Sequence, residues 1–287
     1  MHWDDIAGHA GPVKILRNML AEDKVPHALL FAGRDGLGKM LVARILAAGL
    51  LCFSERPEKP CGECLSCRKI KQGVNPDFVV LENDGGSLKI DQIRALQNEV
   101  SLAPYHGGKR VLIIEEAERM TAQAANSLLK ILEEPPGDTV FVLTAQTPHM
   151  LLPTILSRCW LLRFQPLSHH ELAAYLCKSG AATEKAAVAA RLGAGRIGPA
   201  LTLLADGGLD MRDKALGIVA ELPAFAATDI ERLAAELDKL EGAELKALLG
   251  NISYILRDIL VFLTGQESLV FNIYLAGKIA GLAQIWK

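Results

Sequence analysis

The chain has 287 residues, of which 50% are hydrophobic and 22% charged, and its formal net charge is −2 at pH 7. This length predicts more than one domain and excludes a chain too short for a substantial core. The near-neutral charge excludes a global basic field for nucleic acid or for an anionic membrane, so any DNA contact would be local or made within a larger assembly.

The N-terminal region shows no secretion signal, and no apolar stretch approaches the ~20 residues that span a bilayer. The sequence therefore predicts a cytoplasmic protein with no membrane partner. In that reducing compartment, clustered cysteines are metal ligands more often than disulfides.

Strands alternate with helices over the first 166 residues. The pattern predicts strands at 28–32, 78–81, 110–114, 139–144 and 160–164, and helices at 39–51, 90–101, 122–132 and 150–156. Such alternation requires crossover connections, so it predicts an α/β fold with a parallel sheet and helices on both faces.

The strand signals stop after residue 166. Ser168 and Glu171 form a capping box that opens an all-helical remainder. We therefore predict a nucleotide-binding-type domain at 1–166, a small helical domain at 167–210 and a helical bundle at 211–287. The chain ends within an apolar helical pattern, which predicts that the last domain is truncated.

A phosphate loop joins the first strand to the first helix of the sheet domain. It contains Gly33, Gly36 and Gly38, followed by Lys39 and Met40. Glycines let backbone N–H groups surround phosphate oxygens at a helix N-terminus, and the lysine reaches the outer phosphates. An active loop continues with Ser or Thr to hold Mg²⁺, which Met40 cannot do. The loop leaves ATP or ADP binding open and argues against efficient hydrolysis; the alternative is a chance glycine-rich turn.

The third predicted strand ends in carboxylates, like a Walker B strand. Glu115 and Glu116 directly follow its apolar residues. In an active ATPase the first acid is usually Asp, which binds Mg²⁺, and the second orients water. Glu115 is one methylene longer and misplaces that ligand, so a second Mg²⁺ position is altered. The alternative is that both acids cap the next helix.

Four of the six cysteines, Cys52, Cys61, Cys64 and Cys67, lie between residues 52 and 67. Four thiolates complete a tetrahedral structural zinc site and leave no open position for catalysis. Gly62 permits the tight turn between ligands. Spacing of three residues is also found in some iron–sulfur proteins, and free thiols are the remaining alternative. The pattern favours structural Zn²⁺.

Two further cysteines and one arginine also bear on the prediction. Cys159 and Cys177 stand alone among apolar residues, which predicts that both lie in the core. Arg158 precedes the fifth strand, where an arginine is ordinarily a surface charge. In ring-forming ATPases, however, an arginine at this place can reach a neighbouring subunit's γ-phosphate and stabilise charge in the transition state.

Together these features resemble the bacterial clamp-loader branch of the AAA+ family. The resemblance rests on residues 26–31 before the phosphate loop, the cysteine pattern at 52–67, residues 128–136, and the trio at 157–159. It covers nearly the whole chain. It implies a nucleotide-fold domain with an inserted zinc module, a helical lid and a helical collar that joins subunits into a ring.

The resemblance also implies roles. In such assemblies γ/τ-like motors and a δ-like wrench open a sliding clamp and close it around primed DNA. Here Met40 replaces the motor's Thr, and Gly198 stands at the position of the lid's sensor 2 arginine, with Arg196 two residues away. Thr144 falls at the sensor 1 position. The retained Arg158 implies a stator that supplies an arginine in trans and contacts its partners through the collar and the nucleotide-fold domain.

Three other functions are open. An active γ/τ-like motor would hydrolyse ATP alone and would depend on Lys39. A zinc-dependent nucleic-acid-binding protein with a vestigial nucleotide fold would bind DNA with steep salt dependence, although the acidic balance argues against it. A small-molecule phosphotransferase has no acceptor site in this sequence.

The clamp-loader resemblance implies that the chain belongs to a polymerase holoenzyme without polymerising DNA itself.

Overall fold

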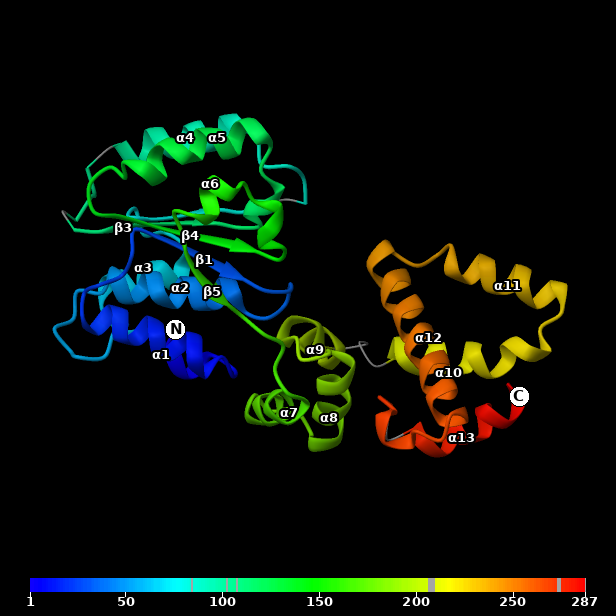
Figure 1. Cartoon of the computed structure of the whole chain (residues 1–287). Coiled ribbons are helices and arrows are strands. Elements are labelled where there is room, and N and C mark those ends of the chain that lie inside the picture. The colour runs from blue at the N-terminus through cyan, green and yellow to red at the C-terminus, as the bar shows by residue number, and fades with distance from the viewer. Residues whose placement is uncertain (84, 102, 107, 206–209, 273–274, 287) are drawn as a thin grey trace. The chain divides into compact units, whose positions relative to one another are not determined.

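The computed structural model describes residues 1–83, 85–101, 103–106, 108–205, 210–272 and 275–286 (Figure 1). The chain forms two compact units, Met1–Pro166 and Leu167–Lys287. Within the described residues, no helix combines the length and the apolar character needed to cross a membrane.

The first unit is built on a parallel sheet with the strand order β2-β3-β4-β1-β5. Its strands are β1 (Ala28–Ala32), β2 (Phe78–Leu81), β3 (Arg110–Ile114), β4 (Thr139–Ala145) and β5 (Trp160–Arg163). The strands β1, β3 and β4 are buried throughout, as expected for parallel strands covered on both faces. The predicted α/β fold is confirmed.

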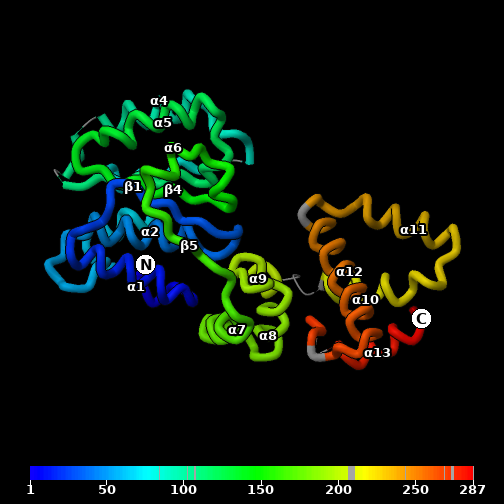
Figure 2. The backbone as a smooth tube through the Cα atoms, in the orientation of Figure 1, coloured from blue at the N-terminus to red at the C-terminus, as the bar shows by residue number. Residues whose placement is uncertain are grey.

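Helices cover both faces of this sheet (Figures 1 and 2). One face carries α1 (Ala10–Ala21), α2 (Lys39–Leu50) and α3 (Leu65–Gln72), and the other carries α4 (Ile90–Ser101), α5 (Ala122–Glu133) and α6 (Pro153–Leu156). Alternate strand residues divide between two cores, because successive side chains point to opposite faces. In β1, for example, Phe31 packs with α2 whereas Leu30 packs with α4 and α5.

One predicted helix is wrong in its extent. Residues 150–156 were expected to be a single helix, but a 3-10 turn ends at Met150 and α6 begins only at Pro153. Proline cannot donate a backbone hydrogen bond and is favoured in the first helical turn, so it begins a new helix here.

The second unit forms only helices in its described residues. They are α7 (His169–Lys178), α8 (Thr183–Leu192), α9 (Ile197–Leu204), α10 (Asp210–Glu221), α11 (Ala227–Leu237), α12 (Gly242–Leu263) and α13 (Ala276–Ile285). The predicted capping box at Ser168 and Glu171 is confirmed at the start of α7. A core that includes Ile255 and Ile279 joins α10, α12 and α13. The division into lid and collar at residue 210 stays a prediction, and residues 206–209 lie outside the described part.

Candidate functional site

The phosphate loop follows β1 directly, and its backbone path requires glycine. A Cβ atom at Gly33 would lie 2.4 Å from the carbonyl oxygen of Phe164. Gly36 and Gly38 adopt left-handed φ angles of 76° and 87°, which side chains disfavour. Gly38 is the N-cap of α2, so the loop delivers the chain to the start of that helix.

Lys39 is bonded to the loop's own backbone. Its Nζ donates to the carbonyl oxygens of Gly33 at 2.6 Å and Arg34 at 2.8 Å, and the residue is only 8% exposed. Burial lowers the pKa of Lys39 below its ordinary value, although nearby carboxylates, Asp35 first among them, act against this shift. A phosphate group would have to replace these internal bonds.

Met40 packs against the apolar core between α2 and the sheet. Its thioether is a weak acceptor and offers no oxygen ligand, whereas Mg²⁺ demands oxygen ligands in octahedral geometry. The position that holds Mg²⁺ in an active loop is therefore apolar.

The predicted carboxylates lie at the same edge of the sheet as the loop. Glu115 and Glu116 follow β3, and their charges act on Lys39. Burial raises the pKa of Glu115, and the charges of Glu116 and Glu82 raise it further, while Arg44 opposes the shift. The structure thus brings together the loop and both predicted acids.

Glu116 is held by polar groups of its own chain. Its Oε2 accepts from Arg119 Nε and from Asn83 Nδ2, both at 2.8 Å. Its Oε1 accepts from Gln146 Nε2 at 3.2 Å. The backbone N–H of Glu116 donates to Thr144 Oγ1 at 3.2 Å, and Thr144 is 2% exposed. The residue at the sensor 1 position is therefore hydrogen-bonded directly to the backbone of the acid.

Sequence reasoning missed these partners of Glu116. Asn83 lies shortly after β2 and Gln146 shortly after β4. Because the carboxyl ends of parallel strands meet at one edge, polar residues at those ends were a usable signal. Glu118 also joins the network: its Oε1 accepts from the Gln146 N–H at 2.7 Å, and its Oε2 is buried without a partner among the described residues.

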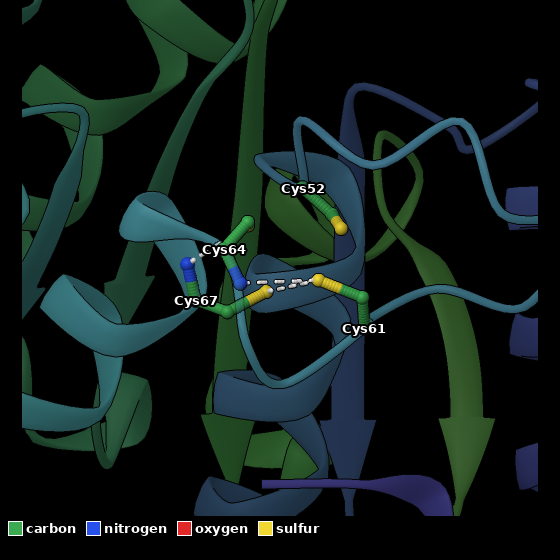
Figure 3. A group of neighbouring side chains, drawn as sticks. All are labelled: Cys52, Cys61, Cys64 and Cys67. Atoms are coloured by element: carbon green, nitrogen blue, oxygen red, sulfur yellow. Dashed lines mark hydrogen bonds between the residues drawn. The ribbon is translucent and has the colours of Figure 1, made fainter.

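The four cysteines converge beyond the C-terminal end of α2 (Figure 3). Their ligand atoms all lie within 4.8 Å of one another, and the sulfur atoms of Cys61 and Cys67 are 4.0 Å apart. Tetrahedral zinc with Zn–S bonds of about 2.3 Å needs sulfur atoms about 3.8 Å apart. The cluster, Cys52, Cys61, Cys64 and Cys67, could therefore hold a metal ion.

Backbone N–H groups also point at these sulfur atoms. Cys64 N donates to Cys61 Sγ at 3.3 Å, and Cys67 N donates to Cys64 Sγ at 3.5 Å. Burial by itself raises the pKa of Cys61, but the N–H groups of Cys64 and Glu63, together with the Cys52 and Cys64 thiols, lower it to about 6. Burial raises the pKa of Cys52 and of Cys67. A bound cation would favour the thiolate form of all four.

Arg158 lies at the amino end of the sheet, opposite to the carboxyl end that carries the phosphate loop. In the parallel register Trp160 pairs with Leu29, and Arg158 lies in the turn just before β5, at the amino end of the sheet. At about 3.3 Å per residue, Gly33 lies roughly 13 Å beyond the pair of Leu29 and Trp160 along the strand direction. The structure therefore does not bring Arg158 together with the phosphate loop of its own chain.

The guanidinium of Arg158 contacts two elements of the first unit. Its Nη2 donates to Glu133 Oε1 at 2.6 Å, and its Nη1 donates to the carbonyl oxygen of Thr154 at 2.9 Å. The side chains of Arg158 and Glu133 are 34% and 51% exposed. Glu133 is the last residue of α5, and the sequence analysis did not single it out.

The prediction that Cys159 and Cys177 lie in the core is only partly right: both are half-buried, and Cys159 packs against the core that contains α4, α5 and α6. Cys159 precedes the edge strand β5, which has a strand on one side only. Burial nevertheless raises its pKa to about 11. Cys177 lies one residue beyond the buried face of α7, which carries Leu176.

The sensor 2 residues lie at the start of α9. Arg196 is the N-cap, and its Nε donates to the carbonyl oxygen of Gly193 at 3.3 Å. Gly198 is the second residue of the helix. Because these residues belong to the second unit, their relation to the phosphate loop stays a prediction.

Comparison with known proteins identifies the family. The family described as "DNA polymerase III, delta subunit" matches residues 8–168. The chain belongs to this family. The delta′ subunit of DNA polymerase III from Bacillus subtilis is 46% identical over 155 residues, which are 54% of this chain and 47% of that protein. The delta′ subunit from Pseudomonas aeruginosa is 44% identical over 135 residues, 46% and 41% of the two chains. The expected resemblance to the clamp-loader delta′ subunits is confirmed.

This member of the delta family is also similar to more distant proteins. The tau subunit of DNA polymerase III from Bacillus subtilis is 38% identical over 158 residues, 54% of this chain and 28% of that protein. A single-residue variant of RuvB from Thermotoga maritima shares the fold, with 18% identity and a TM-score of 0.51 over 75% of this chain and 65% of that chain. The chain spans about half the length of the delta′ relatives it matches.

Proposed function

We propose that this chain is a stator subunit of a DNA polymerase III clamp loader and helps to load the sliding clamp onto primed DNA. It hydrolyses little or no ATP itself and offers Arg158 to the ATP of a neighbouring γ/τ-like motor. The delta′ relatives support this assembly. The observation that carries the proposal is the separation of Arg158 from its own phosphate loop across the sheet.

The chemistry at the phosphate loop supports the absence of hydrolysis in cis. Met40 has no oxygen for Mg²⁺, and the Lys39 ammonium is bonded to backbone carbonyls. The Glu116 carboxylate is already bonded to Arg119, Asn83 and Gln146, so it would have to exchange one of these contacts to orient water. These three features together support little or no hydrolysis in cis.

The surroundings of Arg158 support a role in trans. The neighbouring strand β5 is at the edge of the sheet, and its Trp160 and Leu161 are 53% and 37% exposed. Aromatic side chains and arginine are enriched where protein surfaces meet. A guanidinium presented from such a surface can stabilise the charge that develops on a transferred phosphoryl group.

In this proposal the cysteine cluster holds a structural Zn²⁺ ion. Four thiolates fill the coordination sphere, so the ion would stabilise the fold and activate no water. The ligands Cys52 and Cys67 come from the end of α2 and from α3, so the ion would tie these helices together. Contacts with δ-like and γ/τ-like subunits would run through the collar and the first unit.

The test is ATP turnover by the reconstituted assembly with clamp and primed DNA. Arg158→Ala should lower turnover markedly, since an arginine finger contributes about 10³-fold or more to the site that it serves. Arg158→Lys keeps the charge but lacks the planar fork, so it should restore turnover only in part. Unchanged turnover with Arg158→Ala would remove the trans role.

The same preparations separate the other functions. Robust Mg²⁺-dependent turnover by this chain alone, abolished by Lys39→Ala, would establish a motor. The similarity to the tau subunit is the observation behind this alternative. DNA binding that weakens steeply with salt and is lost with Cys64→Ser would establish a zinc-dependent nucleic-acid-binding protein.

A further inference from the structure

Arg158 is held on both sides by its own chain. Nη2 donates to Glu133 at 2.6 Å, while Nη1 donates to the Thr154 carbonyl at 2.9 Å and lies 3.4 Å from Ser157 Oγ. Of these three acceptors, only the Glu133 carboxylate carries a negative charge. The guanidinium therefore occupies a docked position within the first unit.

Glu133 stands where a helix disfavours a carboxylate. It is the last residue of α5, and the C-terminal end of a helix carries partial negative charge. The helix stops because Glu134 precedes Pro135, and a residue before proline is biased away from helical geometry. Helix stability does not explain an acid at this position, whereas the ion pair with Arg158 does.

A phosphate group and the Glu133 carboxylate would compete for the same guanidinium. Both are anions that accept from its N–H groups, and two anions placed together on one cation repel each other. Engagement of a neighbour's γ-phosphate therefore requires Arg158 to leave Glu133, or the carboxylate to turn away.

We propose that Glu133 is a positioning residue that holds Arg158 docked and releases it when the neighbouring subunit presents ATP. This inference rests on the proposed function, because it supposes that Arg158 acts in trans. The exposure of both partners keeps the ion pair weak, which suits a contact that must break in each cycle.

The ion pair sets the size of the expected effect. An exposed pair of this kind shifts an equilibrium by up to about fivefold. Glu133→Gln keeps the shape and removes the charge, so it should release Arg158 more readily and raise kcat/KM for ATP of the reconstituted assembly by two- to fivefold. Glu134→Gln removes the same charge one residue later and should leave kcat/KM unchanged.

A cycle with Arg158→Ala makes the test specific. In the Arg158→Ala background, Glu133→Gln should have no effect, because the group it releases is gone. A fall in kcat/KM with Glu133→Gln would mean that the carboxylate orients the arginine productively, and it would overturn the holding role. Equal effects of Glu133→Gln and Glu134→Gln, or an effect that persists without Arg158, would also overturn it.

The two proposals fail in different ways. If Arg158→Ala leaves turnover unchanged, the trans role falls and Glu133 has nothing to regulate. If Arg158→Ala lowers turnover while Glu133→Gln matches the native chain, the trans role stands and only the holding role of Glu133 falls.

Discussion

The two ends of the parallel sheet carry charged groups of the kind that phosphate chemistry uses, but they differ in what those groups already contact. At the carboxyl end, Lys39 and Glu116 are bonded to backbone carbonyls and to Arg119. At the amino end, Arg158 has a partly exposed ion pair with Glu133 and donates to the Thr154 carbonyl oxygen. In the proposed function, this difference means that Arg158 acts on a neighbour's ATP while the phosphate loop of the same chain does not hydrolyse ATP.

Burial explains why Lys39 is bonded internally. A buried ammonium or carboxylate must be paired, because an unpaired buried charge is strongly destabilising. A loop that loses its Mg²⁺ ligand can thus remain stable by bonding its lysine internally, as Lys39 does. Exposed ion pairs contribute about 0–1 kcal/mol, so an arginine on the surface can exchange one anion for another.

Both ends of the sheet depend on the fold of the first unit. The largest effect on that fold is expected from removing a ligand of the cysteine cluster. Cys64→Ser removes one ligand, so we expect loss of bound zinc and a decrease of several kcal/mol in the free energy of unfolding of the first unit. Metal analysis and denaturant unfolding measure both quantities. Cys177→Ser, in the second unit, is the control and should leave zinc unchanged. Full zinc content in Cys64→Ser would refute the four-thiolate site.

A smaller loss of folding stability is expected from distorting only the phosphate loop, at the carboxyl end of the sheet. Gly33→Ala places a Cβ atom 2.4 Å from the Phe164 carbonyl oxygen, so the backbone must shift at a cost of about 1–3 kcal/mol. Gly11→Ala, in α1 with open space around it, should be neutral or slightly stabilising. Thermal unfolding of the two variants decides the matter: equal midpoints would mean that the loop is not packed against Phe164.

The smallest effect concerns the charge of Glu115. Burial and Glu116 raise its pKa above the ordinary value of 4.5, so its ionised form destabilises the folded state. The stability that its protonated form gives is present below pH 4.5 and is lost as pH rises through the raised pKa. Glu115→Gln should therefore be more stable than the native chain at pH 8, by less than about 1 kcal/mol because the group is partly solvated.

The pH dependence is the check on this assignment. The difference between Glu115→Gln and the native chain should disappear near pH 4, where Glu115 is protonated. A difference of the same size at pH 4 and pH 8 would mean that burial does not disfavour the charge of Glu115.

The sequence predicts the framework well, because its signals are local. Apolar runs that end in glycine or in carboxylates mark β1 and β3, and parallel strands bring their carboxyl ends together. The cysteine cluster is predictable for the same reason: Cys64 is the N-cap of α3, Cys67 lies in its first turn, and Cys61 is only three residues before the cap.

Side-chain partners could not be predicted in the same way. Glu133 and Arg158 are 25 residues apart, and only the packing of α5 beside α6 brings them within 2.6 Å. The bonds of Lys39 to its own loop depend on which rotamer it adopts when buried. Partial exposure of Cys159 follows from its place before an edge strand, which strand order decides.

The most direct test compares the two ends in one experiment. Lys39→Ala and Arg158→Ala are introduced separately, and ATP turnover of the reconstituted clamp loader is measured with clamp and primed DNA. We expect near-native turnover with Lys39→Ala and a marked loss with Arg158→Ala, both in intact assemblies. The reverse result, loss with Lys39→Ala and none with Arg158→Ala, would show that this chain acts through its own phosphate loop and would contradict the account.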